Sequence, residues 1–371
     1  MDKMEYPKGI VYIGLFFGVL VLSMSCGSDD NQAVAEMTSV EEGRSLQLEN
    51  LYDTQIEPLQ EEHIALTENL IEVAKAFKEM PTTTSLANLK NSWSQAFMFW
   101  EQGEIYNIGV IRNSFVHAQI HEWPVNVQAI EGNIAGAAVI DEAYIASLGV
   151  LSKGYGAMEY LLFHTSEKGI LSEMSSDENA TNRLDYLVSL AENLNTNAKN
   201  LQELWKATAS SFKTRLESGV NGSQNLAVNA VIAELETIKL RKLEQVINAP
   251  DSPELGLEAF FSETSREAIL VNLEALKETY TGNFEGEGFG MEDYLVDVLD
   301  RSDLNDLILA KFDEAIALFG DTESSLKKLT KNDPEKIEVL RDAVTEIIAL
   351  LKNDYSSAAN IVVTFNDNDG D

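Results

Sequence analysis

The sequence predicts an all-α protein in two helical halves, on three observations. From Leu48 onward, apolar residues recur at the 3–4-residue spacing of an amphipathic helix in nearly every segment. The Gly-Val-Asn-Gly-Ser stretch at 219–223 interrupts this pattern and is the best candidate boundary between the halves. Only the run at 361–365 has the composition of a strand, so we expect a short strand-like tail.

The long helices follow from apolar stripes and the breaks between them. Trp93, Phe97 and Trp100 lie at i, i+4 and i+7, a spacing at which aromatic residues usually form core. Ser85 is the predicted N-cap of that helix. The helical period fades over 107–138, where Pro124 predicts a turn. The predicted helices cover residues 48–77, 85–104, 183–217, 226–245, 265–279, 303–319 and 334–355.

The composition is acidic, with 61 Asp and Glu against 27 Lys and Arg and a net charge of −34. Such a surface repels nucleic acid and anionic lipid and attracts cations, so we expect no nucleic-acid partner. Solubility alone is the simpler explanation of the charge. The last six residues, 366–371, resemble a calcium loop in composition but lack its downstream ligand, which favours a solvated terminus.

The N-terminus predicts export. The apolar run at 10–22 is shorter than the ~20 residues of a membrane span and follows two lysines, as in a signal peptide. Small residues before Cys26 resemble a bacterial lipoprotein signal, which predicts a signal peptide at 1–25, a lipid on Cys26 and a polar tether at 26–46. A simple secretory signal with a chance cysteine is the alternative. We expect anchoring at the outer membrane, on its periplasmic face or at the cell surface.

Two acidic side chains lie next to large apolar residues. Glu159 shares a helical face with Tyr155 and Leu162. A lone acid in such a place lies at the rim, is protonated, or has a hydrogen-bond or cation partner. Glu101 follows Trp100 and also needs a partner if it is buried. The alternative is that Glu101 lies at the rim, on the solvated flank of its helix.

A pair of histidines could bind a metal ion. His117 and His121 lie at i and i+4, and Glu122 follows them. On one helix, the pair would suit a transition metal, with Glu122 as a general base. The order differs from the His-Glu-x-x-His of zinc proteases, and the approach to Pro124 favours unwinding of this turn, so we do not predict the metal ligands.

Several motifs resemble the imelysin (M75 peptidase-like) family of bacterial extracytoplasmic proteins from about residue 47 to the end. The stretch Gly-Tyr-Gly-Ala-Met-Glu-Tyr-Leu-Leu-Phe at 154–163 matches the family's Gly-x-His-x-x-Glu-Tyr-Leu-Leu segment, except that Gly156 stands at the histidine position. Other motifs occur in family order: Trp93 with Glu101, Trp123-Pro124, Tyr186-Leu187 through Trp205, Glu258-Ala259-Phe260-Phe261-Ser262, and Val-Thr-Phe-Asn-Asp-Asn-Asp-Gly-Asp at 363–371.

The resemblance implies two helical bundles packed side by side, at 47–218 and 224–371, with the motif lining a cleft between them. It also implies a lipoprotein associated with iron acquisition, and a proposed metallopeptidase activity. In this chain Gly156 removes the imidazole, and Phe260 stands where an arginine is expected. A lone carboxylate is a poor transition-metal site, so we expect no catalytic residues.

We therefore expect a non-catalytic lipoprotein that binds a ligand in the cleft. The predicted ligand-binding residues are Glu159, Glu101, Glu258 and Ser262, and the ligand is iron, another divalent cation or an iron carrier. One alternative is an M75-type metal-dependent peptidase that uses His117 and His121. The other is an architectural partner of an outer-membrane iron transporter.

Overall fold

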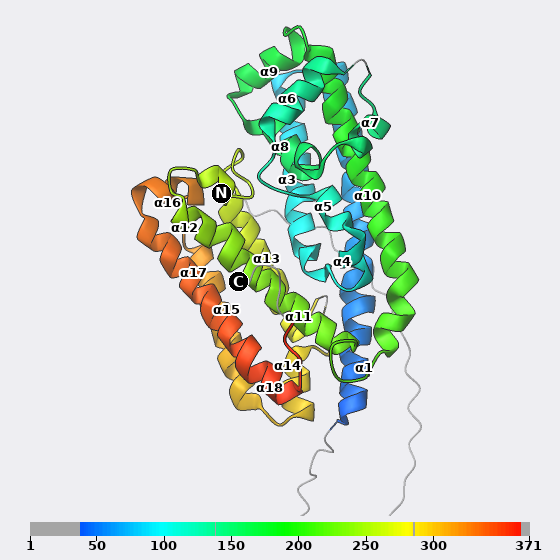
Figure 1. Cartoon of the computed structure of the whole chain (residues 1–371), viewed down its shortest axis with the longest axis vertical. Coiled ribbons are helices and arrows are strands. Elements are labelled where there is room, and N and C mark those ends of the chain that lie inside the picture. Colours follow the sequence, from blue (N-terminus) through cyan, green and yellow to red (C-terminus); the bar gives the residue numbers. More distant parts are fainter. Residues whose placement is uncertain (1–37, 138, 285, 365–371) are drawn as a thin grey trace, which may run out of the picture. The chain divides into compact units, whose positions relative to one another are not determined.

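The computed structural model describes residues 38–137, 139–284 and 286–364 (Figure 1). The predicted signal peptide, Cys26, the tether up to residue 37 and the acidic tail lie outside these residues. The described part of the chain contains helices and no strand, which confirms the all-α prediction. None of its helices is long and apolar enough to cross a membrane.

The first half of the chain contains both long and very short helices. They are α1 (Val40–Asn50), η1 (Leu51–Ile56), α2 (Glu57–Glu79), α3 (Thr83–Gly103), η2 (Glu104–Tyr106), α4 (Val110–Ser114), α5 (Val116–Ile120), α6 (Val127–Gly136), α7 (Glu142–Ser147), η3 (Val150–Ser152), α8 (Gly154–Phe163), α9 (Glu167–Ser175) and α10 (Ala180–Thr214).

The remaining helices follow the loop after α10. They are α11 (Ser223–Glu236), η4 (Thr237–Glu244), α12 (Gln245–Asn248), η5 (Pro253–Leu255), α13 (Ser265–Thr281), α14 (Met291–Asp293), η6 (Tyr294–Val298), α15 (Ser302–Gly320), α16 (Leu326–Asn332), α17 (Pro334–Ala349), η7 (Leu350–Tyr355) and α18 (Ser356–Ala359). The segments η1, η4, η6 and η7 are π-helical, whereas η2, η3 and η5 are 3₁₀ turns.

The long helices pack in two groups that share contacts. Helix α2 packs along α10 and α3, while α15 packs against α13 and α17 (Figure 1). Contacts of α13 with α3 and of α11 with η2 connect the groups. The loop at 215–222 separates α10 from α11 as predicted, and the division into two domains stays a prediction.

Two local expectations were wrong. The N-cap of α3 is Thr82, and Ser85 is its partner: each side-chain oxygen accepts from the other residue's backbone N–H. The tether ends earlier than predicted, because α1 begins at Val40 after the N-cap Ser39. The apolar pattern did not predict this helix, because one of its buried residues is the polar Arg44. The Arg44 side chain donates a hydrogen bond to the side chain of Gln224 at 2.9 Å.

The strand-like run at 361–365 does not form a strand over its described residues, 361–364. Two asparagines of α11 bind its backbone instead. Asn225 Oδ1 accepts from Val362 N, and Asn229 Oδ1 accepts from Thr364 N, both at 2.7 Å. The backbone N–H groups of Val362 and Thr364 therefore bond to side chains rather than to a second strand.

Helix α8 is buried on every side, from Gly154 to Leu162, and not only on the face predicted for Tyr155 and Glu159. Gly154 has φ of +72°, and a Cβ there would lie 2.2 Å from the carbonyl oxygen of Ile120. Only glycine tolerates both conditions. This contact places the start of α8 against the end of α5, where the candidate site lies.

Candidate functional site

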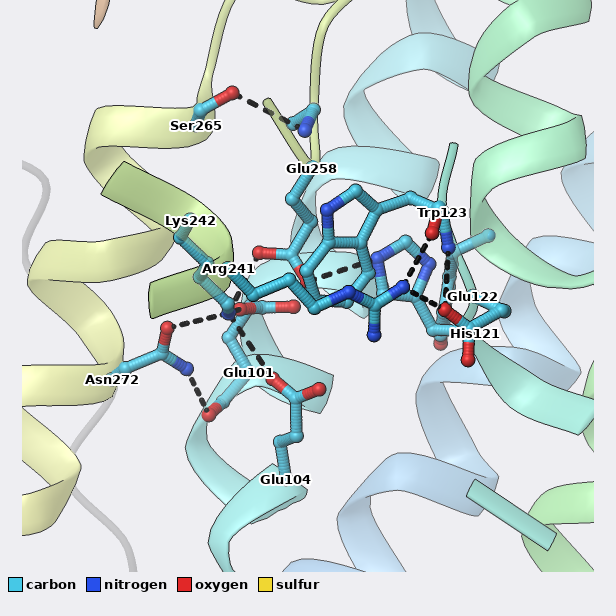
Figure 2. A network of polar contacts seen from close by, with 12 residues as sticks. Glu101, Glu104, His121, Glu122, Trp123, Arg241, Lys242, Glu258, Ser265 and Asn272 are labelled. Carbon is cyan, nitrogen blue, oxygen red and sulfur yellow. Dashed lines mark hydrogen bonds and ion pairs between the residues drawn. The ribbon is translucent and has the colours of Figure 1, made fainter. Parts of the chain in front are cut away.

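Lys242, on the π-helical segment η4, places its ammonium group in a cage of polar side chains (Figure 2). Its Nζ lies 2.7 Å from Glu258 Oε2 and 3.0 Å from Glu101 Oε2. Glu104 Oε2 is 3.2 Å away, and Nζ donates to Asn272 Oδ1 at 2.9 Å. The side chains of Lys242 and Glu101 are 1% and 0% exposed, so this ion pair is separated from solvent.

Burial and the ion pairs shift the pKa values of the cage residues in different directions. Burial, followed by repulsion from Glu258, raises the pKa of Glu101 well above its ordinary value. Burial would also raise the pKa of Glu258, but Lys242 and His121 more than offset it and lower this pKa to about 2. Burial lowers the pKa of Lys242, and the surrounding carboxylates reverse this, so its pKa is raised overall. Lys242 therefore favours the charged form of Glu258, whereas burial disfavours the charged form of Glu101.

His121 connects the cage to the segment before α6. Its Nε2 lies 3.1 Å from Glu258 Oε1, and its ring stacks on Trp123 with 5.5 Å between centroids. The guanidinium of Arg241 lies 3.7 Å from the centroid of the Trp123 ring. Arg241 also donates to the Glu122 carboxylate and to the Trp123 carbonyl oxygen (Figure 2). Two adjacent residues of η4 therefore bind different parts of the site: Lys242 binds the carboxylates of the cage, and Arg241 binds Glu122 and Trp123.

Glu159 lies in a separate hydrogen-bonded pair. Its Oε1 accepts from the backbone N and from Oγ of Ser262, both at 2.7 Å. Burial raises the pKa of Glu159 to about 7, although the Ser262 bonds and His121 act in the opposite direction. Of the three alternatives for this acid, the structure excludes the rim and shows a hydrogen-bond partner, with protonation near neutral pH.

A pocket of about 420 Å³ adjoins the cage. Residues from both halves of the chain line it: Glu104, Ile105, Asn107, Arg112, His117, Ala118, His121, Glu122, Trp123, Ala230, Ala233, Glu234, Thr237 and Arg241. Three of these, Glu104, His121 and Glu234, also belong to the cage or contact it, with Glu234 Oε1 4.0 Å from Lys242 Nζ. The pocket therefore shares a wall with the ion-pair network.

His117 is the unusual residue of the pocket wall. It is 7% exposed, and neither ring nitrogen has a hydrogen-bond partner. Burial, followed by the nearby His63, lowers the pKa of His117 to about 3, so its imidazole is neutral under physiological conditions. A neutral imidazole offers one N–H donor and one lone pair. Its ring makes an edge contact with Trp100, with 4.8 Å between the ring centroids and 62° between the ring planes.

The four predicted ligand-binding residues form two pairs. Glu101 and Glu258 meet at Lys242, whereas Glu159 and Ser262 bind each other. None of the four is among the residues that line the pocket. Their role in ligand binding stays a prediction, and Glu258 contacts one residue of the pocket wall, His121.

The two histidines do not share a helical face. Helix α5 ends at Ile120, and His121 is extended, with φ of −148° and ψ of 131°. The helical pair that the metal hypothesis required is absent for this reason, as the approach to Pro124 suggested. Within the described residues, one group of three side chains brings metal-binding atoms within 4.8 Å of each other: Glu101, His121 and Glu258.

This group does not fit the metal ion that the resemblance implies. Both oxygens of Glu258 are engaged, Oε2 by Lys242 and Oε1 by His121. The missing imidazole cannot simply be restored, because a Cβ on Gly156 would lie 2.8 Å from Val125 Cγ1 and 3.1 Å from the carbonyl oxygen of Glu122.

Sequence reasoning missed Lys242, although the signal was present. Leu235, Ile238 and Lys242 lie at i, i+3 and i+7 of a predicted helix, so the apolar stripe carries a lysine. A buried lysine needs partners, and Glu101 was a buried acid in need of one. In the structure Lys242 and Glu101 are each other's partners. A single sequence does not show that two residues 141 positions apart are in contact.

The family model named Imelysin (Peptidase_M75) matches residues 60–353. A crystal structure from Parabacteroides distasonis ATCC 8503, described as an iron-regulated protein A precursor, has a TM-score of 0.73 at 17% identity, over 88% of this chain and 97% of that one. An imelysin-like protein from Psychrobacter arcticum 273-4 has a TM-score of 0.72 at 18% identity, over 90% and 100%. No curated protein matches the chain. Because the family model covers most of its length, the chain belongs to the imelysin family.

Proposed function

We propose that this chain is a non-catalytic imelysin of the cell envelope, and that it binds iron or an iron chelate in the pocket at His117. One observation carries the proposal: a buried imidazole lines the pocket with both nitrogens unpaired. An unsatisfied buried polar group costs about 1–3 kcal/mol, and native structures keep few of them. A ligand that uses these nitrogens removes that cost.

Iron suits the chemistry of this wall. A neutral imidazole is a ligand for Fe as well as for Zn and Cu, and the low pKa of His117 keeps its lone pair available. The net charge of −34 favours the approach of cations. The name of the Parabacteroides neighbour, an iron-regulated protein A precursor, supports an iron-linked role here.

Thermal unfolding tests the pocket. Ferric citrate or Fe²⁺ at about 100 times its Kd should stabilise the native chain by about 2.7 kcal/mol, seen as a higher Tm. His117→Ala should lose this shift. The matched control is His164→Ala, since His164 is bonded to Tyr160 and Glu173 and does not line the pocket. An equal shift in native protein and His117→Ala would refute the assignment.

We extend the proposal to the outer membrane, with a lipid on Cys26 as the anchor. This cysteine lies outside the described residues, and the proposal rests on the small residues that precede it. Cells fed labelled palmitate should label the native protein and not Cys26→Ser, which should also leave the membrane fraction. Labelling that persists in the variant would exclude this anchor.

We do not extend the proposal to a metal-dependent peptidase. That alternative needs His117 and His121 on one helical face and carboxylates free to bind a metal. Neither condition holds, because His121 lies beyond the end of α5 and both oxygens of Glu258 are engaged. Partnership with an outer-membrane iron transporter remains compatible with a ligand-binding role. Affinity purification from cells grown with and without iron distinguishes the two, because only the partnership requires co-purification of the transporter.

A further inference from the structure

We propose that Lys242 is a built-in cation, whose ammonium group occupies the place between Glu101, Glu258 and His121 that a divalent metal ion would need. The native cage is then closed to metals by a residue of the chain itself. This inference does not depend on the ligand of the neighbouring pocket.

The spacing of the three side chains is that of a metal site. Their ligand atoms lie within 4.8 Å of one another, and ligands on a metal such as zinc sit about 2.0–2.2 Å from the ion. Yet Nζ of Lys242 lies 2.7 Å from Glu258 and 3.0 Å from Glu101. An incoming ion would compete with the ammonium for these carboxylates and would be repelled by its charge.

The ammonium cannot move aside easily. The Lys242 side chain is 1% exposed, and Nζ donates to Asn272 Oδ1 at 2.9 Å. Asn272 is itself fixed, because its Nδ2 donates to the backbone carbonyl of Glu101 at 2.9 Å. The amide therefore joins the lysine to the helix that carries one of the carboxylates (Figure 2).

The ion pairs of the cage support the same conclusion. Nζ of Lys242 lies within 3.2 Å of carboxyl oxygens of Glu258, Glu101 and Glu104. A divalent ion would have to displace an ammonium that all three of these groups hold. Removing Lys242 leaves two carboxyl groups and an imidazole, a mixed oxygen and nitrogen set that suits zinc.

Two substitutions at position 242 test the inference. Lys242→Ala removes the charge and opens space, whereas Lys242→Met removes the charge and keeps the space filled. We expect Lys242→Ala to gain one Zn²⁺ per chain, bound at least about tenfold more tightly than by native protein, which is 1.4 kcal/mol. Lys242→Met should show no gain. Isothermal titration with Zn²⁺ against a weak competing chelator measures both, and Glu258→Gln in the Lys242→Ala background should abolish the gain.

Repeating the titration in a His117→Ala background separates the cage from the pocket. The tighter Zn²⁺ binding caused by Lys242→Ala should persist in that background. Failure of the proposal for the His117 pocket would therefore leave the proposal for Lys242 unaffected. Folded Lys242→Ala that binds zinc no better than Lys242→Met would overturn the inference. So would a zinc ion that native protein binds and Glu258→Gln loses.

A measurement on the unaltered protein covers the case in which the variants do not fold. In protein labelled with ¹⁵N-lysine, the Lys242 ammonium should give a signal protected from exchange with water, and one equivalent of Zn²⁺ should leave it unchanged. Loss or displacement of that signal by zinc would show that a metal can take the place of the ammonium.

Discussion

Replacing Lys242 by methionine should lower the free energy of unfolding by about 3–5 kcal/mol at pH 7.5. Removing one partner of a buried ion pair leaves the other charge uncompensated, and costs of this size are typical. Here Glu258, 1% exposed at its side chain, would lose its closest cation. Chemical denaturation of native and variant protein measures the difference.

The loss should shrink as the pH falls towards 5. Without the ammonium, His121 is left to oppose burial, which is the largest influence on the pKa of Glu258 and raises it. We therefore expect protonation of Glu258 to favour the folded variant. In the native protein the pKa of Glu258 is about 2, and its contribution is lost only as the pH falls from about 4.5 through 2. The control is Lys239→Met on the same helix, whose ion pair with Glu244 spans 3.9 Å at partly exposed side chains. A Lys242→Met cost no larger than that of the control would contradict the buried ion pair.

Raising the pH from 5 to 8 should destabilise the native protein by about 2–3 kcal/mol more than Glu159→Gln. The folded-state pKa of Glu159 is raised to about 7, so its stabilising effect is complete below the unfolded value near 4.5 and is lost as the pH rises through 7. The glutamine keeps an oxygen that can accept the two Ser262 bonds and does not titrate. Denaturant titrations across this pH range give the two slopes.

Other buried acids titrate in both proteins and cancel in that comparison. One of these is Glu234, whose pKa is raised to about 8 by burial and by Glu104. Glu178→Gln, at an exposed position, shows the effect of losing one carboxylate anywhere on this acidic chain. Parallel pH profiles for native protein and Glu159→Gln would mean that Glu159 stays ionised in the folded state.

Local patterns predicted the helices well, because each depends on neighbours in sequence. The aromatic stripe of Trp93, Phe97 and Trp100 is core, as its spacing indicated. The failures have a different origin. Helix α1 is stabilised by Arg44 bonded to Gln224, and the tail by Asn225, so their conformations depend on residues far along the chain.

The sequence predicted several residues of the candidate site, but not which of them contact each other. Burial of Glu101 and Glu159 beside aromatic residues was readable from spacing, as was their need for partners. Their partners, Lys242 and Ser262, come from the other half of the chain. Glu101 is paired with Glu258 through one ammonium, rather than with Glu159. This pairing depends on the packing of α13 against both α3 and η4, which a single sequence does not show.

The π-helical segment η4 has a consequence for how this site can change. It lies within one continuous helical stretch from Ser223 to Asn248, and a π turn holds one residue more than an α turn needs. Each residue of an α-helix turns the chain by about 100°. Deleting a single residue from the segment, with both flanks unaltered, would therefore rotate Lys242 out of the cage and bring a different side chain to face Glu101 and Glu258. The chemistry of this cage is set by helical register as much as by the identity of the residue at position 242.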